Sequence, residues 1–120
     1  MAHPTRFAQL TAEAKTRIRE VTPAEAHKEK AEGAVLIDVR ETDEFSQAHA
    51  VGAIHLSKGV LELRIEEAVP DVSTPIICYC GGGSRSALAA DNLQKMGYTH
   101  VASLAGGLRA WHNEGLPLTH

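Results

Sequence analysis

Short apolar runs alternate with amphipathic stretches along most of the chain. Two of the runs are rich in β-branched residues and bounded by polar or turn-forming residues, which is the pattern of parallel strands buried on both faces. Two weaker runs predict further strands. The predicted strands are AVLIDVR (34–40), GAIHL (52–56), TPIICYC (74–80) and HVASLAG (100–106).

The clearest helix signal lies in VTPAEAHKEKAEG, residues 21–33. Thr22 is placed as the N-cap, and Glu25 three positions later completes a capping box. Pro23 occupies the first helical position and Gly33 provides the stop. Further helices are predicted at TDEFSQAHA, beginning at Thr42, at residues near 60–69, at SALAADNLQKMG, ended by Gly97, and at GLRAWHNEG.

An additional helix precedes these elements. Phe7, Leu10, Ala14 and Ile18 follow one another at spacings of three and four, which places them on one face of a helix over residues 5–18. We expect this face to dock on the body of the protein or to make a dimer contact.

Strands that alternate with helices through one short chain indicate the α/β class. We expect an open, mostly parallel sheet of about five strands with helices on both faces, preceded by an appended N-terminal helix. A chain of 120 residues with 43% hydrophobic content suffices for one compact core and is too short for two ordinary domains. The expected division is a helical extension over residues 1–20 and an α/β domain over 21–120.

Composition and charge narrow the partners and the compartment. The formal charge is −3 with acids and bases interspersed, and aromatic residues make up only 4% of the chain, so we expect no nucleic-acid partner. The first 20 residues carry acids and no continuous apolar segment of signal-peptide length. No stretch is long enough to span a membrane. These features favour a cytoplasmic protein without a membrane partner.

The cysteines and histidines point away from disulfides and metals. Cys78 and Cys80 are two apart on a predicted strand, where their Cα separation is too long for an unstrained bridge. Two reduced thiols suit a cytoplasm. The seven histidines are scattered, and no cysteine–histidine spacing resembles a zinc site, so no metal is expected.

The segment CGGGSRS, residues 80–86, carries the strongest chemical signal. A thiolate at a strand's end, facing N–H groups that lead into a helix, is stabilised by the helix dipole and by those donors. Gly81, Gly82 and Gly83 can adopt positive φ, which would let consecutive amides turn inward. Arg85 adds a fork of donors suited to an oxyanion. We therefore expect a reactive sulfur in a loop that holds negative charge.

Two simpler interpretations of this segment are weaker. A plain strand-to-helix turn beside a buried cysteine does not need three glycines followed by Arg85. A nucleotide-binding phosphate loop requires a lysine followed by Ser or Thr, which this loop lacks.

Four segments, in the same order along the chain, resemble the signatures of the rhodanese family. The likeness runs from about Val21 to Pro117. The second segment departs from the family's pattern, with Ala48 where glycine is common, Ala50 for an isoleucine and Val51 for a proline. The four segments are LIDVRETDEF (36–45), AHAVGAIHL (48–56), the active-site loop CGGGSRS (80–86) and the C-terminal signature LAGGLRAW (104–111).

The resemblance implies a single-domain thiosulfate sulfurtransferase that needs no organic cofactor or metal. In such an enzyme Cys80 takes a sulfane sulfur from an anionic donor such as thiosulfate, releases sulfite and keeps a persulfide. The persulfide then passes to cyanide or to a thiol. The amides of residues 81–86 would stabilise the outer sulfur as an oxyanion hole holds charge, Arg85 would steer the donor, and Ser84 and Ser86 would add hydroxyl donors.

Loop length separates this prediction from related families. Four residues stand between Cys80 and Arg85, whereas the related cell-cycle tyrosine phosphatases have five, so an arsenate reductase or phosphatase is disfavoured. Relatives that use mercaptopyruvate typically lack an arginine at the position of Arg85, which favours thiosulfate as the donor. A non-catalytic relay module, which accepts persulfide from a protein partner and hands it on, would use the same loop and stays open.

Several charged residues are candidates for supporting roles. Asp38 and Arg40 end a predicted strand, and in the family such residues join a charged network under the active loop; a structural salt bridge is an equally good interpretation. Glu44 either pairs with an arginine or is solvated. SKGVLELR resembles an Arg-Gly-x-x-Glu variant of some rhodaneses, so Lys58 and Arg64 are candidates for attracting an anionic donor, with surface charge as the default.

The remaining candidates are interpreted as structural. Cys78 is expected to be an inert core cysteine rather than a resolving thiol. His49 and His55 are expected to be satisfied structural histidines rather than bases. Trp111 is expected to anchor the last helix in the core.

Overall fold

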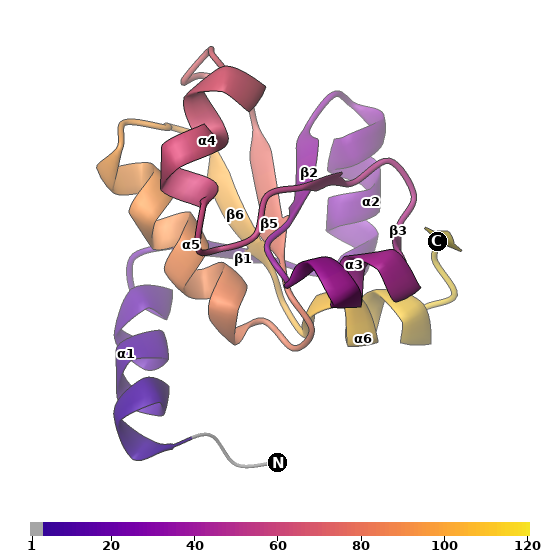
Figure 1. Cartoon of the computed structure of the whole chain (residues 1–120), viewed down its shortest axis with the longest axis horizontal. Coiled ribbons are helices and arrows are strands. Elements are labelled where there is room, and N and C mark those ends of the chain that lie inside the picture. Colours follow the sequence, from indigo (N-terminus) through magenta and orange to yellow (C-terminus); the bar gives the residue numbers. More distant parts are fainter. Residues whose placement is uncertain (1–3) are drawn as a thin grey trace.

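A computed structural model describes residues 4–120, so residues 1–3 of the predicted extension lie outside the described chain. A central parallel sheet is flanked by helices (Figure 1), and its strand order is β1-β6-β5-β2-β4. Every neighbouring pair in this sheet is parallel, which confirms the predicted fold class. The strands are β1 (Arg19–Val21), β2 (Val35–Asp38), β4 (Ile54–His55), β5 (Ile76–Tyr79) and β6 (Val101–Leu104).

The helices that follow the first one fall where the amphipathic stretches predict them. The capping box at the second helix is present: the Thr22 side chain accepts from the Glu25 N–H at 3.2 Å, and the Glu25 carboxylate accepts from the Thr22 N–H at 2.8 Å. The helices are α1 (Thr5–Lys15), α2 (Pro23–Ala31), α3 (Thr42–Gln47), α4 (Leu61–Ala68), α5 (Ser84–Lys95) and α6 (Gly107–Asn113). None of them is long and apolar enough to cross a lipid bilayer.

Side chains of the strands contribute to two separate cores, one on each face of the sheet. The first core joins alternate residues of the strands to apolar residues of α4 and α5, and it contains both Cys78 and Cys80. The second core joins the intervening strand residues to α2 and α6. Trp111 is buried in this second core and donates its indole N–H to the Pro117 carbonyl at 2.9 Å, which confirms its predicted anchoring role.

The register of the sheet puts Cys80 at the carboxyl edge. β5 lies between β2 and β6, with Asp38 opposite Tyr79 and Ser103 opposite Cys78. Because β5 ends at Tyr79, Cys80 is the first residue beyond the strand, where open α/β sheets form their sites.

The leading helix differs from its prediction. Its buried residues are Thr11 and Ala14, while the side chain of Leu10, predicted to share the docking face, is 53% exposed. The helix also ends at Lys15, so Ile18 lies in the connection to β1 and packs against the first core from there.

Helix α1 packs along α5 (Figure 1). The Arg17 guanidinium binds the Asp91 carboxylate of α5 with two hydrogen bonds of 3.0 and 2.8 Å. Gln94 adds a bond of 3.0 Å to the Arg17 carbonyl. The docking of the N-terminal helix therefore rests on a polar clamp as well as on the burial of Ala14.

Two features of the fold were not predicted. β1 is a short edge strand that pairs with β6. β3 (His49–Ala50) and β7 (Leu118–Thr119) form a separate antiparallel ribbon.

Candidate active site

The sulfur of Cys80 lies among backbone donors at the start of α5. Cys80 Sγ accepts the N–H of Gly83 at 3.1 Å and that of Ser86 at 3.4 Å. The Ser86 hydroxyl is 3.5 Å from the same sulfur and 2.8 Å from the Ser103 hydroxyl. Donors of this kind, together with the N-terminal end of a helix, stabilise a thiolate.

Only one of the three loop glycines uses the left-handed region. Gly83 has φ +105°, whereas Gly81 and Gly82 have no positive φ, so only one of the three glycines that could adopt a positive φ does so. A single left-handed residue suffices because Gly83 is the N-cap of α5 and turns the chain into that helix.

The rest of the loop is held by hydrogen bonds from α6. The N–H of Leu108 donates to the Cys80 carbonyl at 2.8 Å, and the N–H of Arg109 donates to the Gly81 carbonyl at 3.2 Å. Across a trans peptide the C=O of one residue and the N–H of the next point in opposite directions. These two bonds therefore turn the amides of Gly81 and Gly82 away from the start of α6.

Gly107 permits this close approach of α6 to the loop. It has φ +59°, and a Cβ at this position would lie 2.5 Å from the Cys80 carbonyl oxygen and 2.6 Å from the Gly81 carbonyl carbon. Both neighbours are backbone atoms, so no flexible side chain can move to make room. Gly107, the second glycine of LAGGLRAW, thus allows α6 to pack directly against the backbone of the active loop.

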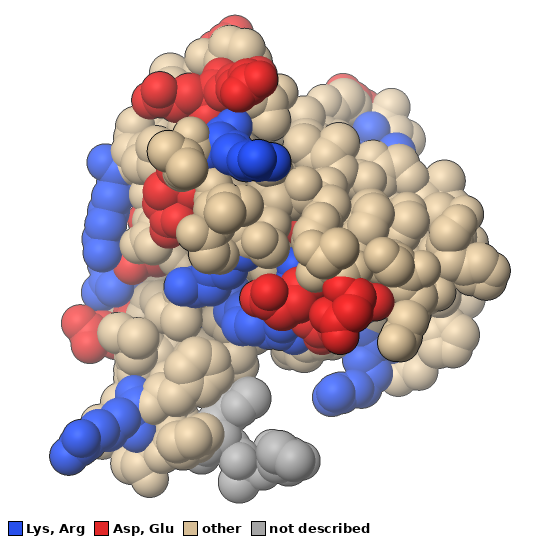
Figure 2. Space-filling model, viewed as in Figure 1, with Lys and Arg blue, Asp and Glu red and all other residues tan. Residues whose placement is uncertain are grey.

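Arg85 forms a two-pronged ion pair with Glu44 of α3. Its Nη1 and Nη2 lie 2.8 and 3.2 Å from the two carboxylate oxygens. The hydrogen bonds from Arg85 are the main reason that the pKa of Glu44 falls from 4.5 to about 2. Of the two interpretations left open for Glu44, the pairing with an arginine is correct. Figure 2 shows acidic side chains gathered against basic ones on this face of the molecule.

A pocket of about 650 Å³ opens over Cys80. Cys80 has a relative exposure of only 1%, so it lies at the floor of the pocket that it lines. Phe7 and Arg109 line the pocket and were not predicted as site residues. The lining residues are Phe7, Glu44, Cys80, Gly81, Gly82, Ser84, Arg85 and Arg109.

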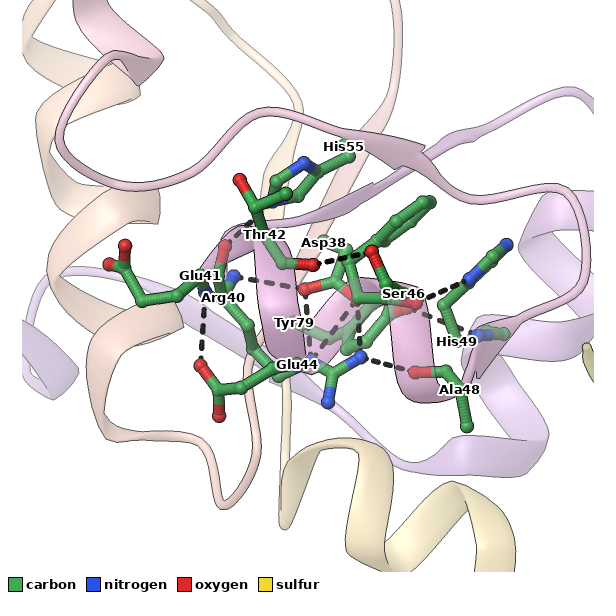
Figure 3. A network of polar contacts seen from close by, with 12 residues as sticks. Asp38, Arg40, Glu41, Thr42, Glu44, Ser46, Ala48, His49, His55 and Tyr79 are labelled. Atoms are coloured by element: carbon green, nitrogen blue, oxygen red, sulfur yellow. Dashed lines mark hydrogen bonds and ion pairs between the residues drawn. The ribbon is translucent and has the colours of Figure 1, made fainter. Parts of the chain in front are cut away.

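Asp38 and Arg40 form a buried ion pair beside β2 (Figure 3). Arg40 Nη2 binds an Asp38 oxygen at 2.8 Å and the Ala48 carbonyl at 2.6 Å. The His55 ring nitrogen Nε2 lies 2.7 Å from the Arg40 carbonyl. These contacts fix the chain between β2 and β4, as a structural salt bridge does. The expected support of the active loop by this pair stays a prediction.

The two histidines of the second signature have structural partners. The rings of His49 and His55 stack on Phe45, with centroid distances of 3.7 and 4.7 Å. His49 Nδ1 also lies 2.9 Å from the Phe45 carbonyl. These contacts agree with the interpretation of both histidines as structural.

Cys78 lies within β5 and, unlike Cys80, does not line the pocket. It is fully buried, and this burial raises the pKa of its thiol to about 12. Cys78 and Cys80 are both free thiols, as the spacing predicts.

The predicted donor-attracting cations lie apart from the Cys80 pocket. Arg64 lines a different hollow of about 440 Å³, together with Leu56, Glu67 and Ala68. Lys58 is absent from the lining residues of the Cys80 pocket. Attraction of a donor over a longer range by these two charges stays a prediction. Within residues 4–120, no group of three or more His, Cys, Asp or Glu side chains is arranged to hold a metal ion.

Curated relatives match most of the chain. The thiosulfate sulfurtransferase GlpE of Haemophilus influenzae (strain PittEE) is 36% identical over 100 residues, which cover 83% of this chain and 93% of the relative. The thiosulfate sulfurtransferase PspE of Escherichia coli (strain K12) is 42% identical over 73 residues, which cover 61% of this chain and 69% of the relative.

Solved structures give a consistent comparison. A protein of unknown function from Rhodopseudomonas palustris, described as a possible tyrosine phosphatase, is 31% identical with a TM-score of 0.87 and matches 99% of this chain and 98% of its own. A thiosulfate sulfurtransferase from Pseudomonas aeruginosa is 38% identical with a TM-score of 0.79, over 86% of this chain and 20% of that one. The family model "Rhodanese-like domain" matches residues 22–114. The chain therefore belongs to the rhodanese-like domain family.

Proposed function

We propose that this protein is a thiosulfate sulfurtransferase in which Cys80 is the nucleophile. The observation that carries the proposal is the pair of backbone amides, from Gly83 and Ser86, that donate to Cys80 Sγ at the floor of a pocket. The curated relatives named thiosulfate sulfurtransferase support the same activity.

The first half-reaction is a displacement at sulfur. The Cys80 thiolate attacks the outer sulfur of thiosulfate, a new S–S bond forms, and the original S–S bond breaks with its electron pair leaving on sulfite. Cys80 then carries a persulfide. No proton needs to move when both reactants are anions, so a separate general base is not required.

The loop stabilises the charge that appears on the outer sulfur. The amides of residues 81–86 are the proposed donors, and their preorganised positions act as those of an oxyanion hole do. The hydroxyls of Ser84 and Ser86 are proposed to assist, since Ser84 lines the pocket and Ser86 already contacts the sulfur.

In the second half-reaction a nucleophile attacks the outer sulfur and restores the Cys80 thiolate. Cyanide gives thiocyanate, and a thiolate gives a new persulfide. A protein thiol is a further candidate acceptor, in which case the module works as a persulfide relay. A reducing compartment such as the cytoplasm suits this chemistry, because Cys80 must be reduced to accept sulfur.

A phosphatase is the second candidate. The similarity to the Rhodopseudomonas palustris protein, described as a possible tyrosine phosphatase, favours it. The four residues between Cys80 and Arg85 count against it, because a ring that tight suits a single sulfur better than a tetrahedral phosphate. The pairing of Arg85 with Glu44 also reduces the positive charge that a phosphate dianion would require.

The test combines thiosulfate and cyanide with the purified protein and follows thiocyanate, while mass spectrometry follows the gain of one sulfur atom on Cys80. Cys80→Ser should abolish both signals, and the matched control Cys78→Ser should keep them. Absence of both signals from the wild-type protein would exclude sulfur transfer. Sulfur loading without turnover to cyanide would favour the relay, and phosphate release from an aryl phosphate without sulfur loading would favour the phosphatase.

A further inference from the structure

One wall of the pocket comes from outside the segment that the family model matches. The match covers residues 22–114, whereas Phe7 lies on α1 and lines the same pocket as Cys80. Phe7 is half-buried, so it is partly covered by the protein and partly accessible from the pocket that it lines.

The position of Phe7 is fixed by the packing of α1 on α5. Arg17, just after α1, is clamped to Asp91 in the second half of α5, while Phe7, near the start of α1, meets the loop at the beginning of α5. The two helices therefore run in opposite directions, and the start of α1 lies over the active loop. The ion pair between Arg17 and Asp91 thus holds Phe7 in place as the apolar wall of the pocket.

The two arginines of the pocket differ in whether a carboxylate neutralises them. Arg85 is bound through both guanidinium prongs to Glu44. The guanidinium of Arg109, an exposed residue of α6, lines the same pocket and has no ion-pair partner among residues 4–120. Arg109 is therefore the cation that is available to an incoming anion.

The pocket is also larger than a small inorganic anion requires. Its volume of about 650 Å³ leaves room for an organic group beside the anion. A group attached to the donor would meet an apolar ring on one side and a guanidinium on the other.

We propose that Phe7 selects the sulfur donor, favouring an organic thiosulfonate, in which one oxygen of thiosulfate is replaced by an apolar or aromatic group, and that Arg109 binds the charged end of the donor. The proposal rests on the sulfurtransferase function of Cys80. The sulfonyl oxygens bind Arg109, the organic group packs against Phe7, and the outer sulfur faces Cys80.

The reaction with this donor keeps the same balance of atoms and charges. The Cys80 thiolate forms a bond to the outer sulfur, the bond between that sulfur and the sulfonyl sulfur breaks, and the electron pair leaves on a sulfinate. One thiolate and one thiosulfonate anion become one persulfide anion and one sulfinate anion, so no oxidant or proton is required.

The experiment compares kcat/KM for benzenethiosulfonate with kcat/KM for thiosulfate, with cyanide as the acceptor, in the wild type and in three variants. Phe7→Ala should lower the ratio of the benzenethiosulfonate value to the thiosulfate value about 10-fold, because it removes about half of the free energy gained by burying an aromatic ring. Arg109→Gln should lower both values about 10-fold, mainly through KM. Phe7→Trp should keep the preference, because it restores an aromatic wall.

Leu10→Ala is the matched control, since Leu10 lies one turn further along α1 and is largely exposed away from the pocket lining. It should leave both values at the wild-type level. An unchanged ratio of the two kcat/KM values in Phe7→Ala would overturn the selection by Phe7. An unchanged KM for both donors in Arg109→Gln would overturn the role of Arg109. A wild-type protein that transfers sulfur from neither donor would overturn the sulfurtransferase function itself, and the proposal with it.

Discussion

Replacement of Gly107 by alanine tests whether the active loop depends on its contact with α6. The new Cβ would overlap the carbonyl oxygen of Cys80 at 2.5 Å and the carbonyl carbon of Gly81 at 2.6 Å. Since real Cβ atoms do not approach backbone atoms this closely, α6 must move away from the loop. Such a shift would break the bonds that Leu108 and Arg109 donate to these carbonyls.

The cost can be divided into two parts. A non-glycine residue at a left-handed φ costs about 1–2 kcal/mol. Each of the two lost hydrogen bonds adds about 0.5–1.5 kcal/mol. Gly115→Ala isolates the first part, because Gly115 has φ +72° and a Cβ there would meet no atom within 4 Å. We therefore expect Gly107→Ala to lose about 1–3 kcal/mol more free energy of unfolding than Gly115→Ala.

Urea denaturation measures this difference, and thiocyanate formation measures its effect on the site. Gly107→Ala should lose most of its sulfur transfer even at urea concentrations where it is folded, while Gly115→Ala should keep wild-type activity. Equal losses of stability in the two variants, with equal activity, would refute the idea that α6 holds the loop.

Three further predictions concern other residues of the fold. In the native protein at pH 8, iodoacetamide should label Cys80 and spare Cys78, because burial raises the pKa of the Cys78 thiol to about 12. Mass spectrometry should count a second label only after unfolding. Two labels on the folded protein would contradict this prediction. Arg85 lowers the pKa of Glu44 from 4.5 to about 2. Glu44 should therefore contribute stability that is complete above pH 4.5 and is lost as the pH falls toward 2. The difference in urea midpoint between the wild type and Glu44→Gln should therefore shrink over that window, and a constant difference would show that the pair is not formed. Thr11→Val should leave the melting temperature unchanged or raise it, because the buried Thr11 hydroxyl has no hydrogen-bond partner in the described structure; a clear fall would reveal a partner.

Signals that are local in the chain predicted most of the fold. The β-branched runs around Ile37 and Ile77 mark buried strands, and Thr22 with Glu25 marks a helix start, because each pattern depends on neighbours a few residues away. The position of Cys80 at the sheet edge follows from the same logic, since a residue that ends a central parallel strand must lie at the carboxyl edge.

The features that escaped prediction depend on contacts between distant parts of the chain. The edge strand over residues 19–21 and the ribbon between residues 49–50 and 118–119 are too short to carry an alternating pattern of their own. The presence of Phe7 in the pocket depends on the clamp between Arg17 and Asp91, which are 74 residues apart. Arg109 lies within LAGGLRAW, but the role proposed for it depends on the ion pair between Arg85 and Glu44.

The contact between α6 and the active loop joins the two cores of the protein. The loop leads into α5, which packs in the first core, while its carbonyls accept the N–H groups of Leu108 and Arg109 from α6, whose Trp111 packs in the second. The exchange of these two amide protons with solvent thus depends on both halves of the molecule staying closed. Their exchange rates, followed by NMR, would report the integrity of the site in a protein that holds no substrate and performs no turnover.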